Sequence, residues 1–158
     1  MTSVKIKPLQ DASQQVKSWQ AAGQKVVFTN GCFDLIHLGH VDYLEKARNL
    51  GDRLVVGLNT DSSVSRFKGP ERPLQDQVSR ARVMASFQFV DLVVFFDEDT
   101  PQNLISELVP NVLVKGGDYL AENIVGADVV KNNGGSVKTI DFVPGYSTTR
   151  IVEKIKRT

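Results

Sequence analysis

The feature that most constrains the fold is a regular alternation of short apolar runs and helical patterns along the chain. The first four runs, rich in β-branched residues, are nearly continuous, which is typical of strands buried on both faces of a sheet. Segments with helical spacing separate the runs, and this alternation predicts an α/β fold with a parallel sheet and right-handed crossovers. The five expected strands are 25–29, 53–58, 91–96, 111–116 and 136–142.

Local signals mark where several helices begin and end. Asp76 is a candidate N-cap for the helix that follows it, and Pro101 suits the first position of a helix. Gly51 is a candidate C′ glycine for the helix after the first strand. The segment 148–157 is amphipathic, with cations in its last turn, where they suit the helix dipole. We expect the longest irregular stretch at 66–75, and a loop of that length is often functional.

Composition and charge limit the classes of function. The chain has 158 residues, which suits one domain, and its formal net charge of +1 comes with scattered basic residues. Because a nucleic-acid binder usually carries a concentrated basic face, we expect no nucleic-acid partner. No apolar run approaches the roughly 20 residues of a membrane span, and the first residues lack a signal-peptide core. With a single cysteine and therefore no internal disulfide, the protein is expected to be cytoplasmic, with no membrane partner.

The stretch TNGCFDLIHLGH, residues 29–40, joins the first expected strand to the next helix. In open α/β sheets, ligands bind beyond the carboxyl ends of the strands, where the strand order reverses. A loop that enters a helix N-terminus offers free amides and the positive end of a dipole, which suits phosphate. The stretch is neither a P-loop nor the dinucleotide glycine motif. In its H-x-G-H pattern, His37 and His40 can point to one side, and Gly39 would let a phosphate approach the backbone.

Three other interpretations of this stretch stay open on the residues alone. Cys32, Asp34 and the two histidines could bind zinc, although their spacing matches none of the usual zinc patterns. Cys32 could act as a nucleophile, which needs an adjacent base and an orienting third group, or it could be a small buried hydrophobe. The histidines could also be purely structural, with their hydrogen bonds satisfied inside the loop.

Three separated segments resemble the nucleotidylyltransferases of the cytidylyltransferase-like superfamily. They are the strand and loop ending in NGCFDLIHLGH, the basic stretch RFKGPERP, and GYSTTRIVEKI, a Ser/Thr-rich turn that opens the last helix. Within the superfamily, LVKGGDY, FDEDTPQNLI and NNGGSVKTIDF resemble the heptose 1-phosphate adenylyltransferases most. The resemblance implies one Rossmann-like nucleotidylyltransferase domain over 1–158, with a five-stranded parallel sheet flanked by helices and an N-terminal helical extension at 1–23.

The resemblance also implies a reaction. AMP would pass from ATP to D-glycero-β-D-manno-heptose 1-phosphate, giving ADP-heptose and pyrophosphate for lipopolysaccharide core or related heptose glycan synthesis. The sugar phosphate would attack the α-phosphorus in line, without a covalent enzyme intermediate. Mg²⁺ is expected to arrive with ATP rather than in a protein metal site, because the sequence shows no carboxylate cage. Relatives often join this domain to a sugar kinase domain, and here a separate kinase is expected to supply the sugar 1-phosphate. Relatives also commonly form dimers, so a homodimer is expected.

Individual roles follow from the same resemblance. His37 and His40 are expected to contact the phosphates of ATP, and Lys68 to bridge the α-phosphate and the sugar phosphate, so these three are the expected catalytic residues. Contacts with substrate or phosphate are expected of Asp34, Arg72, Arg80 and Arg150. Nucleotide contacts are expected of residues at two strand ends, in the first loop and at the start of the last helix: Phe28, Thr29, Asn30, Gly31, Phe33, Gly39, Lys115, Gly116, Asp118, Ser147, Thr148 and Thr149.

Simpler roles stay open for several of these residues. The hydroxyls at 147–149 can cap the last helix, Asp34 can orient its own loop, and Arg80 can be an exposed helical arginine. For the whole protein, the open alternatives are a glycerol-3-phosphate cytidylyltransferase, an FAD synthetase, or a nucleotide-binding module without turnover.

Overall fold

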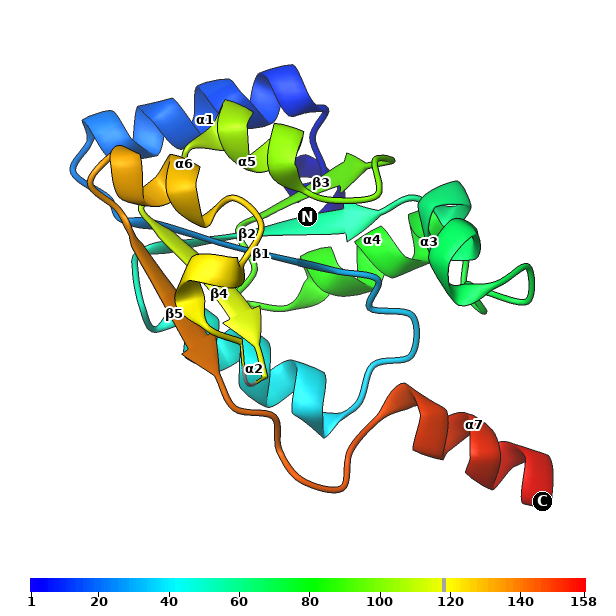
Figure 1. Ribbon diagram of the computed structural model, residues 1–158. Helices are drawn as coiled ribbons and strands as arrows, with labels where there is room; N and C mark the ends of the chain where they lie inside the picture. The colour runs from blue at the N-terminus through cyan, green and yellow to red at the C-terminus, as the bar shows by residue number, and fades with distance from the viewer. Residues whose placement is uncertain (118) are drawn as a thin grey trace.

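A parallel sheet of five strands organises the protein (Figure 1). The computed structural model describes residues 1–117 and 119–158. The strand order is β3-β2-β1-β4-β5, so β1 lies between β2 and β4 and the order reverses at β1 and β4. The predicted fold class and all five strands are confirmed, with bounds β1 (Val26–Gly31), β2 (Arg53–Asn59), β3 (Leu92–Phe96), β4 (Val112–Gly116) and β5 (Ser136–Ile140).

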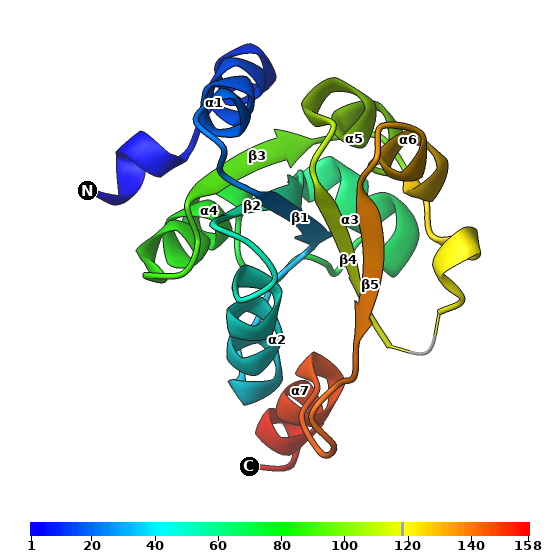
Figure 2. The same cartoon turned by 90° about the vertical axis from the view of Figure 1, so that its left-hand side faces the viewer.

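Helices cover both faces of this sheet, as Figure 2 shows most clearly. One face carries α1, α5 and α6, and the other carries α2 and α4. Helix α3 follows the carboxyl end of β2, and α7 extends beyond α2 at the C-terminus. The helix bounds are α1 (Leu9–Ala21), α2 (Leu38–Arg48), α3 (Asp61–Lys68), α4 (Gln77–Ser86), α5 (Gln102–Leu108), α6 (Ala127–Asn132) and α7 (Thr148–Arg157), with two 3-10 turns, η1 (Thr2–Lys5) and η2 (Ala121–Asn123).

Two hydrophobic clusters form the core, one on each face of the sheet. Val26 and Phe28 point to the first cluster, whereas Val27 between them points to the second, as the period of a strand requires. All three side chains are fully buried. Burial of such a side chain stabilises the folded state by about 1.5–3 kcal/mol. Because both faces of the inner strands are buried, these strands are continuous apolar runs rather than alternating ones.

Several helix ends follow the sequence signals. Asp76 is the N-cap of α4, because its carboxylate accepts a hydrogen bond from the amide of Ser79 at 2.9 Å. The last helix has the predicted bounds, 148–157. The signal at Pro101 is wrong by one position, since Pro101 is itself the N-cap and α5 begins at Gln102.

Two other signals fail for physical reasons. Helix α2 ends at Arg48, before Gly51, and a Cβ at Gly51 would lie 2.7 Å from the carbonyl oxygen of Lys25. Close packing on β1 therefore explains this glycine, not a left-handed C′ conformation. The stretch predicted to be irregular begins as helix, because α3 extends to Lys68 from an N-cap at Thr60. Within the described part of the chain, no helix is both long and apolar enough to cross a membrane.

Candidate active site

A cleft of about 990 Å³ opens at the carboxyl ends of β1 and β4, where the strand order reverses. This is the place where open α/β sheets bind their ligands. The cleft is lined by the loop between β1 and α2, the ends of α3 and β4, and the segment that leads from β5 into α7. Most of the predicted site residues meet there: Asn30, Gly31, Phe33, Asp34, His37, Gly39, His40, Lys68, Lys115, Gly116, Ser147, Thr148 and Thr149.

The two histidines form a stacked pair at the start of α2. Their ring centroids are 3.9 Å apart and the ring planes differ by 23°. His37 is the N-cap residue of α2, with extended backbone, and the amide of His40 donates to its carbonyl oxygen at 2.9 Å. Phe33 packs edge-on against His40, with 5.4 Å between the two ring centroids. The turn therefore holds both imidazoles side by side on the cleft wall.

Both imidazoles are poorly basic in this position. Burial lowers the pKa of His40 to about 4, and the positive charges of His37 and Lys68 act in the same direction. Burial also lowers the pKa of His37. Neutral imidazoles can stack without charge repulsion, and each still carries one N–H to donate. Among the described residues, neither Nδ1 atom has a hydrogen-bond partner that meets ordinary geometry, although both atoms are buried.

Gly39 makes room for a histidine ring. A Cβ on Gly39 would lie 3.0 Å from both Cε1 and Nδ1 of His37, tighter than an ordinary side-chain contact. The sequence predicted that this glycine lets a phosphate approach the backbone. The packing instead explains it by the space that the ring of His37 needs. Gly31 does the same for Phe33, whose ring would lie 2.9 Å from a Cβ at that position.

Two lysines bring positive charge to the cleft from different elements. Lys68 is the last residue of α3 and is exposed to solvent. Lys115 is on β4 and half-buried, and burial lowers the pKa of its ammonium group. Its Nζ lies 5.9 Å from the ring centroid of Tyr119, a cation–π contact. Both lysines line the cleft.

The start of α7 lies against the same loop. The hydroxyl of Ser147 accepts a hydrogen bond from the amide of Arg150 at 3.2 Å, so its capping role is real. The hydroxyl of Thr148 donates to the carbonyl oxygen of Leu35 at 3.4 Å, which joins α7 to the loop between β1 and α2. Two helix N-termini, those of α2 and α7, therefore contribute residues to one cleft, and each provides free amides and a positive dipole end.

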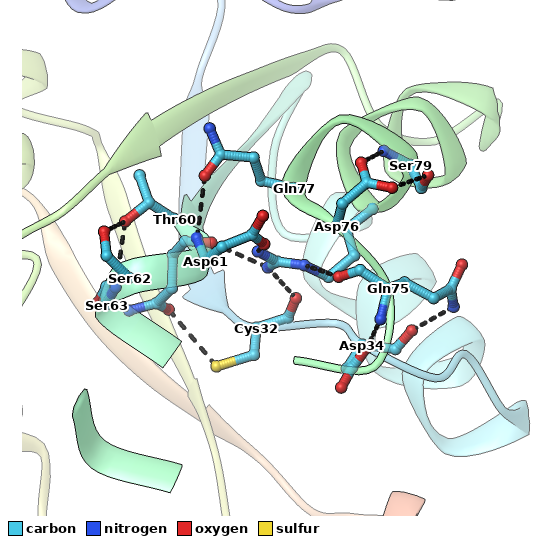
Figure 3. Close-up of polar contacts among 12 residues, drawn as sticks. Cys32, Asp34, Thr60, Asp61, Ser62, Ser63, Gln75, Asp76, Gln77 and Ser79 are labelled. Carbon is cyan, nitrogen blue, oxygen red and sulfur yellow. Dashed lines mark hydrogen bonds and ion pairs between the residues drawn. The ribbon is translucent and has the colours of Figure 1, made fainter. Parts of the chain in front are cut away.

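Asp34 lines the cleft, but its carboxylate is hydrogen-bonded within the protein. Its two oxygens accept hydrogen bonds from the amides of Leu74 and Gln75 at 2.7 and 2.8 Å. Figure 3 shows Asp34 beside Gln75. The guanidinium of Arg72 lies 3.5 Å from the same carboxylate. Asp34 is buried. Of its two predicted roles, the structure gives the orienting one, and it ties Arg72 into the same contact.

Arg80 is not at the cleft, which corrects the prediction that it contacts substrate phosphate. Its side chain is fully buried, and all three guanidinium nitrogens are paired inside the protein. Nε donates to the carbonyl oxygen of Gln75, and Nη1 to those of Cys32 and Asn59 at 2.8 and 2.9 Å. Nη2 forms an ion pair with Asp61 at 2.8 Å. Arg80 therefore holds the loops around the cleft together and is not free to bind a ligand.

Four other predicted contacts do not appear at the cleft. Phe28 and Thr29 are fully buried in β1, where the ring of Phe28 belongs to the core and the hydroxyl of Thr29 bonds that of Tyr43 at 2.7 Å. Arg72 is engaged with Asp34, and Arg150 donates to the carbonyl oxygen of Gly145 at 2.8 Å outside the cleft lining. Asp118 lies outside the described residues.

Cys32 lines the cleft as an unactivated thiol. Burial raises its pKa, although Lys68 and Arg80 nearby oppose the shift. Its sulfur is 3.8 Å from the side-chain oxygen of Asn59, which is an acceptor and not a base for catalysis. A nucleophilic cysteine needs the opposite shift. In residues 1–117 and 119–158, no group of three or more His, Cys, Asp or Glu side chains is arranged to hold a metal ion, so the zinc interpretation finds no ligand set there.

Comparison with known proteins fixes the family. The sequence model described as cytidylyltransferase-like matches residues 28–154, which include every described lining residue of the cleft. The chain belongs to the cytidylyltransferase-like family. Among the curated members with similar sequence are two proteins called bifunctional protein HldE. The one from Magnetococcus marinus is 58% identical over 97% of this chain, and the one from Gluconobacter oxydans is 59% identical over 92%. The chain spans about a third of the length of these relatives, 31% and 30%.

Two solved structures share the fold of this chain. The lipopolysaccharide core biosynthesis protein from Thermoplasma volcanium GSS1 is 29% identical, with a TM-score of 0.61 over 77% of this chain and 98% of that one. A pantoate-beta-alanine ligase from Francisella tularensis, in complex with beta-gamma ATP and beta-alanine, has a TM-score of 0.60 over 97% of this chain and 78% of its own. Its identity is 14%, so it supports the fold alone.

Sequence reasoning missed the aromatic residues of this cytidylyltransferase-like cleft. Tyr43, Phe67, Tyr119, Phe142 and Tyr146 all line it. These residues are scattered along the chain and belong to no recognisable motif, so the sequence did not mark them as site residues. One signal was available: Phe142 and Tyr146 lie between the last strand and the Ser/Thr turn, in the segment DFVPGYSTT, which crosses the ligand edge of any such sheet.

Proposed function

We propose that the protein transfers AMP from ATP to D-glycero-β-D-manno-heptose 1-phosphate, forming ADP-heptose and pyrophosphate. The observation that carries this proposal is the neutral pair His37 and His40, stacked at the start of α2 in a cleft that also contains Lys68 and Lys115. Family membership supports nucleotidyl transfer. The heptose substrate is supported by the HldE relatives and by the similarity to a lipopolysaccharide core biosynthesis protein.

The chemistry needs positioning and charge stabilisation rather than a nucleophilic side chain. An oxygen of the sugar phosphate attacks the α-phosphorus, the bond from that phosphorus to the bridging oxygen breaks, and pyrophosphate leaves with the electron pair. His37 and His40 would donate to phosphate oxygens that gain charge in the transition state. Lys68 would bring two anions together by neutralising their repulsion. The unactivated state of Cys32 fits direct transfer.

The triphosphate has a second group of donors at α7. The free amides at the start of this helix and the hydroxyls of Ser147, Thr148 and Thr149 suit phosphate oxygens. Because Thr148 also bonds the carbonyl oxygen of Leu35, phosphate binding at α7 would fix the loop that carries His37. Lys115 and Gly116 at the end of β4 line the part of the cleft that we assign to the nucleoside.

Mg²⁺ would accompany ATP in this proposal. Two carboxylates line the described cleft: Asp34, which is spent on backbone amides, and Asp99, which pairs with Arg66 at 3.3 Å. This donor set does not fit a protein cage, but it fits a metal carried by the phosphates, which is the usual habit of Mg²⁺ with nucleotides. When bound, the ion would neutralise phosphate charge, and no step described above depends on a protein ligand to it.

The reaction would take place in the cytoplasm, where ATP is available. Its sugar 1-phosphate would come from a sugar kinase, and the word bifunctional in the names of the HldE relatives fits a kinase activity on the same pathway. We further propose a homodimer as the working state, which analytical ultracentrifugation tests directly: a monomer at micromolar concentration would contradict it.

Pyrophosphate release with paired substrates tests the function. The protein is incubated with Mg²⁺, one nucleoside triphosphate and one acceptor: heptose 1-phosphate, glycerol 3-phosphate or FMN. We expect release with ATP and heptose 1-phosphate only. Release with CTP and glycerol 3-phosphate, or with ATP and FMN, would replace the heptose assignment by a sister activity. ATP binding without any release would indicate a nucleotide-binding module.

A further inference from the structure

Phe142 is an exposed apolar side chain that lines the cleft. It follows β5, lines the cleft, and is 63% exposed. Exposed apolar residues are common on protein surfaces and need no explanation by themselves. This one differs because of its position: it lies at the ligand edge of the sheet, in the segment between β5 and the phosphate-binding turn at the start of α7.

The ring of Phe142 lies directly against the backbone of two glycines at the end of β4. A Cβ on Gly116 would be 2.5 and 2.6 Å from ring atoms Cε1 and Cζ, and one on Gly117 would be 3.0 Å from Cε2. Gly117 also has a φ of +92°, which favours glycine. No larger residue fits at position 116 without moving the ring. The absence of side chains at these two glycines therefore makes room for the ring of Phe142.

This contact changes the expected place of the nucleoside. From the sequence, Gly116 at the end of β4 is expected to contact the nucleotide itself. In the structure the phenyl ring already covers that backbone. The ring is also supported by Tyr43, whose ring centroid is 6.4 Å away. A ring that is fixed on one side by glycine backbone and open on the other offers a flat apolar surface to the cleft.

We propose that the Phe142 ring is the platform on which the purine base of ATP stacks. This inference rests on the proposed function, since it assigns the base subsite of the same cleft. Several other cleft groups suit the phosphates: the histidine pair, Lys68 and the start of α7 are cationic or donor groups. Among the aromatic residues of the cleft, Phe142 is the one whose ring lies on the glycine backbone at the end of β4. Stacking on an aromatic ring accepts any base because every base has a π-face. Phe142 therefore supplies affinity for the nucleoside part, and the choice of base lies with other contacts.

Calorimetric binding to two probes tests this assignment. The probes are ATP and inorganic tripolyphosphate, which has the phosphates without the nucleoside. We expect Phe142→Ala to weaken ATP binding by about 5- to 150-fold, the range that loss of base stacking spans, and to leave tripolyphosphate binding unchanged. Phe142→Trp should retain ATP binding, since it keeps an aromatic face.

A matched control separates stacking from a general loss of apolar surface. Ile155 on α7 has the same exposed fraction, 63%, and does not line the cleft. Ile155→Ala should bind both probes like the wild type. Equal weakening of ATP and tripolyphosphate by Phe142→Ala, or unchanged or tighter ATP binding, would overturn the platform while leaving the proposed function standing. If the wild type binds no nucleoside triphosphate, both the platform and the proposed function fail.

Discussion

Arg80 and Asp61 form an ion pair of 2.8 Å in which the guanidinium is fully buried and the carboxylate is partly exposed. The same guanidinium also bonds carbonyl oxygens of the loop after β1, the end of β2 and the segment before α4. One side chain thus joins the segments that surround the cleft. These contacts position the loops around the cleft.

Loss of Arg80 should therefore destabilise the fold. We expect Arg80→Ala to lower the free energy of unfolding by about 3 kcal/mol or more, because buried carbonyl oxygens and a carboxylate lose their partner. Denaturant titration measures this. Arg82, two positions along the same helix and exposed, provides the matched control, and Arg82→Ala should stay within about 0.5 kcal/mol of the wild type. Equal stability of the two variants would contradict the positioning role.

The histidine pair should be essential for turnover. We expect His40→Ala to lower kcat by about 10²-fold or more, the scale of losing one donor to a transition-state oxyanion. Steady-state pyrophosphate release gives the rate. Leu38 lies in the same turn, is exposed and does not line the cleft, so Leu38→Ala should keep the wild-type rate. A near-normal kcat for His40→Ala would remove this residue from the reaction.

The lowered pKa of His40 should make stability depend on pH. Its folded pKa, about 4, is below its ordinary value of 6.5, so the unfolded chain binds more protons in that window. The free energy of unfolding therefore has its full value, as far as His40 is concerned, above pH 6.5, and it decreases as the pH falls toward 4. Denaturation of the wild type and of His40→Asn at pH 7 and pH 5 checks the sign. The wild type should lose more stability than the variant, and an identical loss would show that the imidazole is not held neutral.

Cys32 should be dispensable. Its thiol has a raised pKa and bonds only the side-chain oxygen of Asn59 among the described residues, so Cys32→Ser should turn over ATP at close to the wild-type rate. Circular dichroism confirms that the variant is folded. A folded but inactive serine variant would favour the nucleophile interpretation instead.

Chelation should stop the reaction without unfolding the protein. If Mg²⁺ arrives with ATP, EDTA abolishes pyrophosphate release, added Mg²⁺ restores it, and the circular dichroism spectrum does not change. Loss of structure on chelation would instead indicate a structural metal, for which residues 1–117 and 119–158 show no ligand group.

The sequence predicted those features that depend on neighbours along the chain. The buried runs, the H-x-G-H spacing and the helix at 148–157 each carry a local periodic or capping signal, and all agree with the structure. Features that depend on distant backbone could not be predicted in this way. The buried guanidinium of Arg80 bonds carbonyl oxygens from other loops. Every residue has a carbonyl oxygen, so residue types do not indicate which ones will lie near Arg80. The contact of Phe142 with Gly116 likewise joins β4 to the segment after β5.

The central claim is that AMP is transferred to a heptose 1-phosphate, and the mass of the product tests it most directly. ATP, Mg²⁺ and D-glycero-β-D-manno-heptose 1-phosphate are incubated with the protein, and the products are analysed by mass spectrometry. We predict ADP-heptose and pyrophosphate in equal amounts, with His40→Ala forming almost none. ATP left intact beside the heptose phosphate, while another acceptor in its place is converted to a nucleotidyl product, would contradict it.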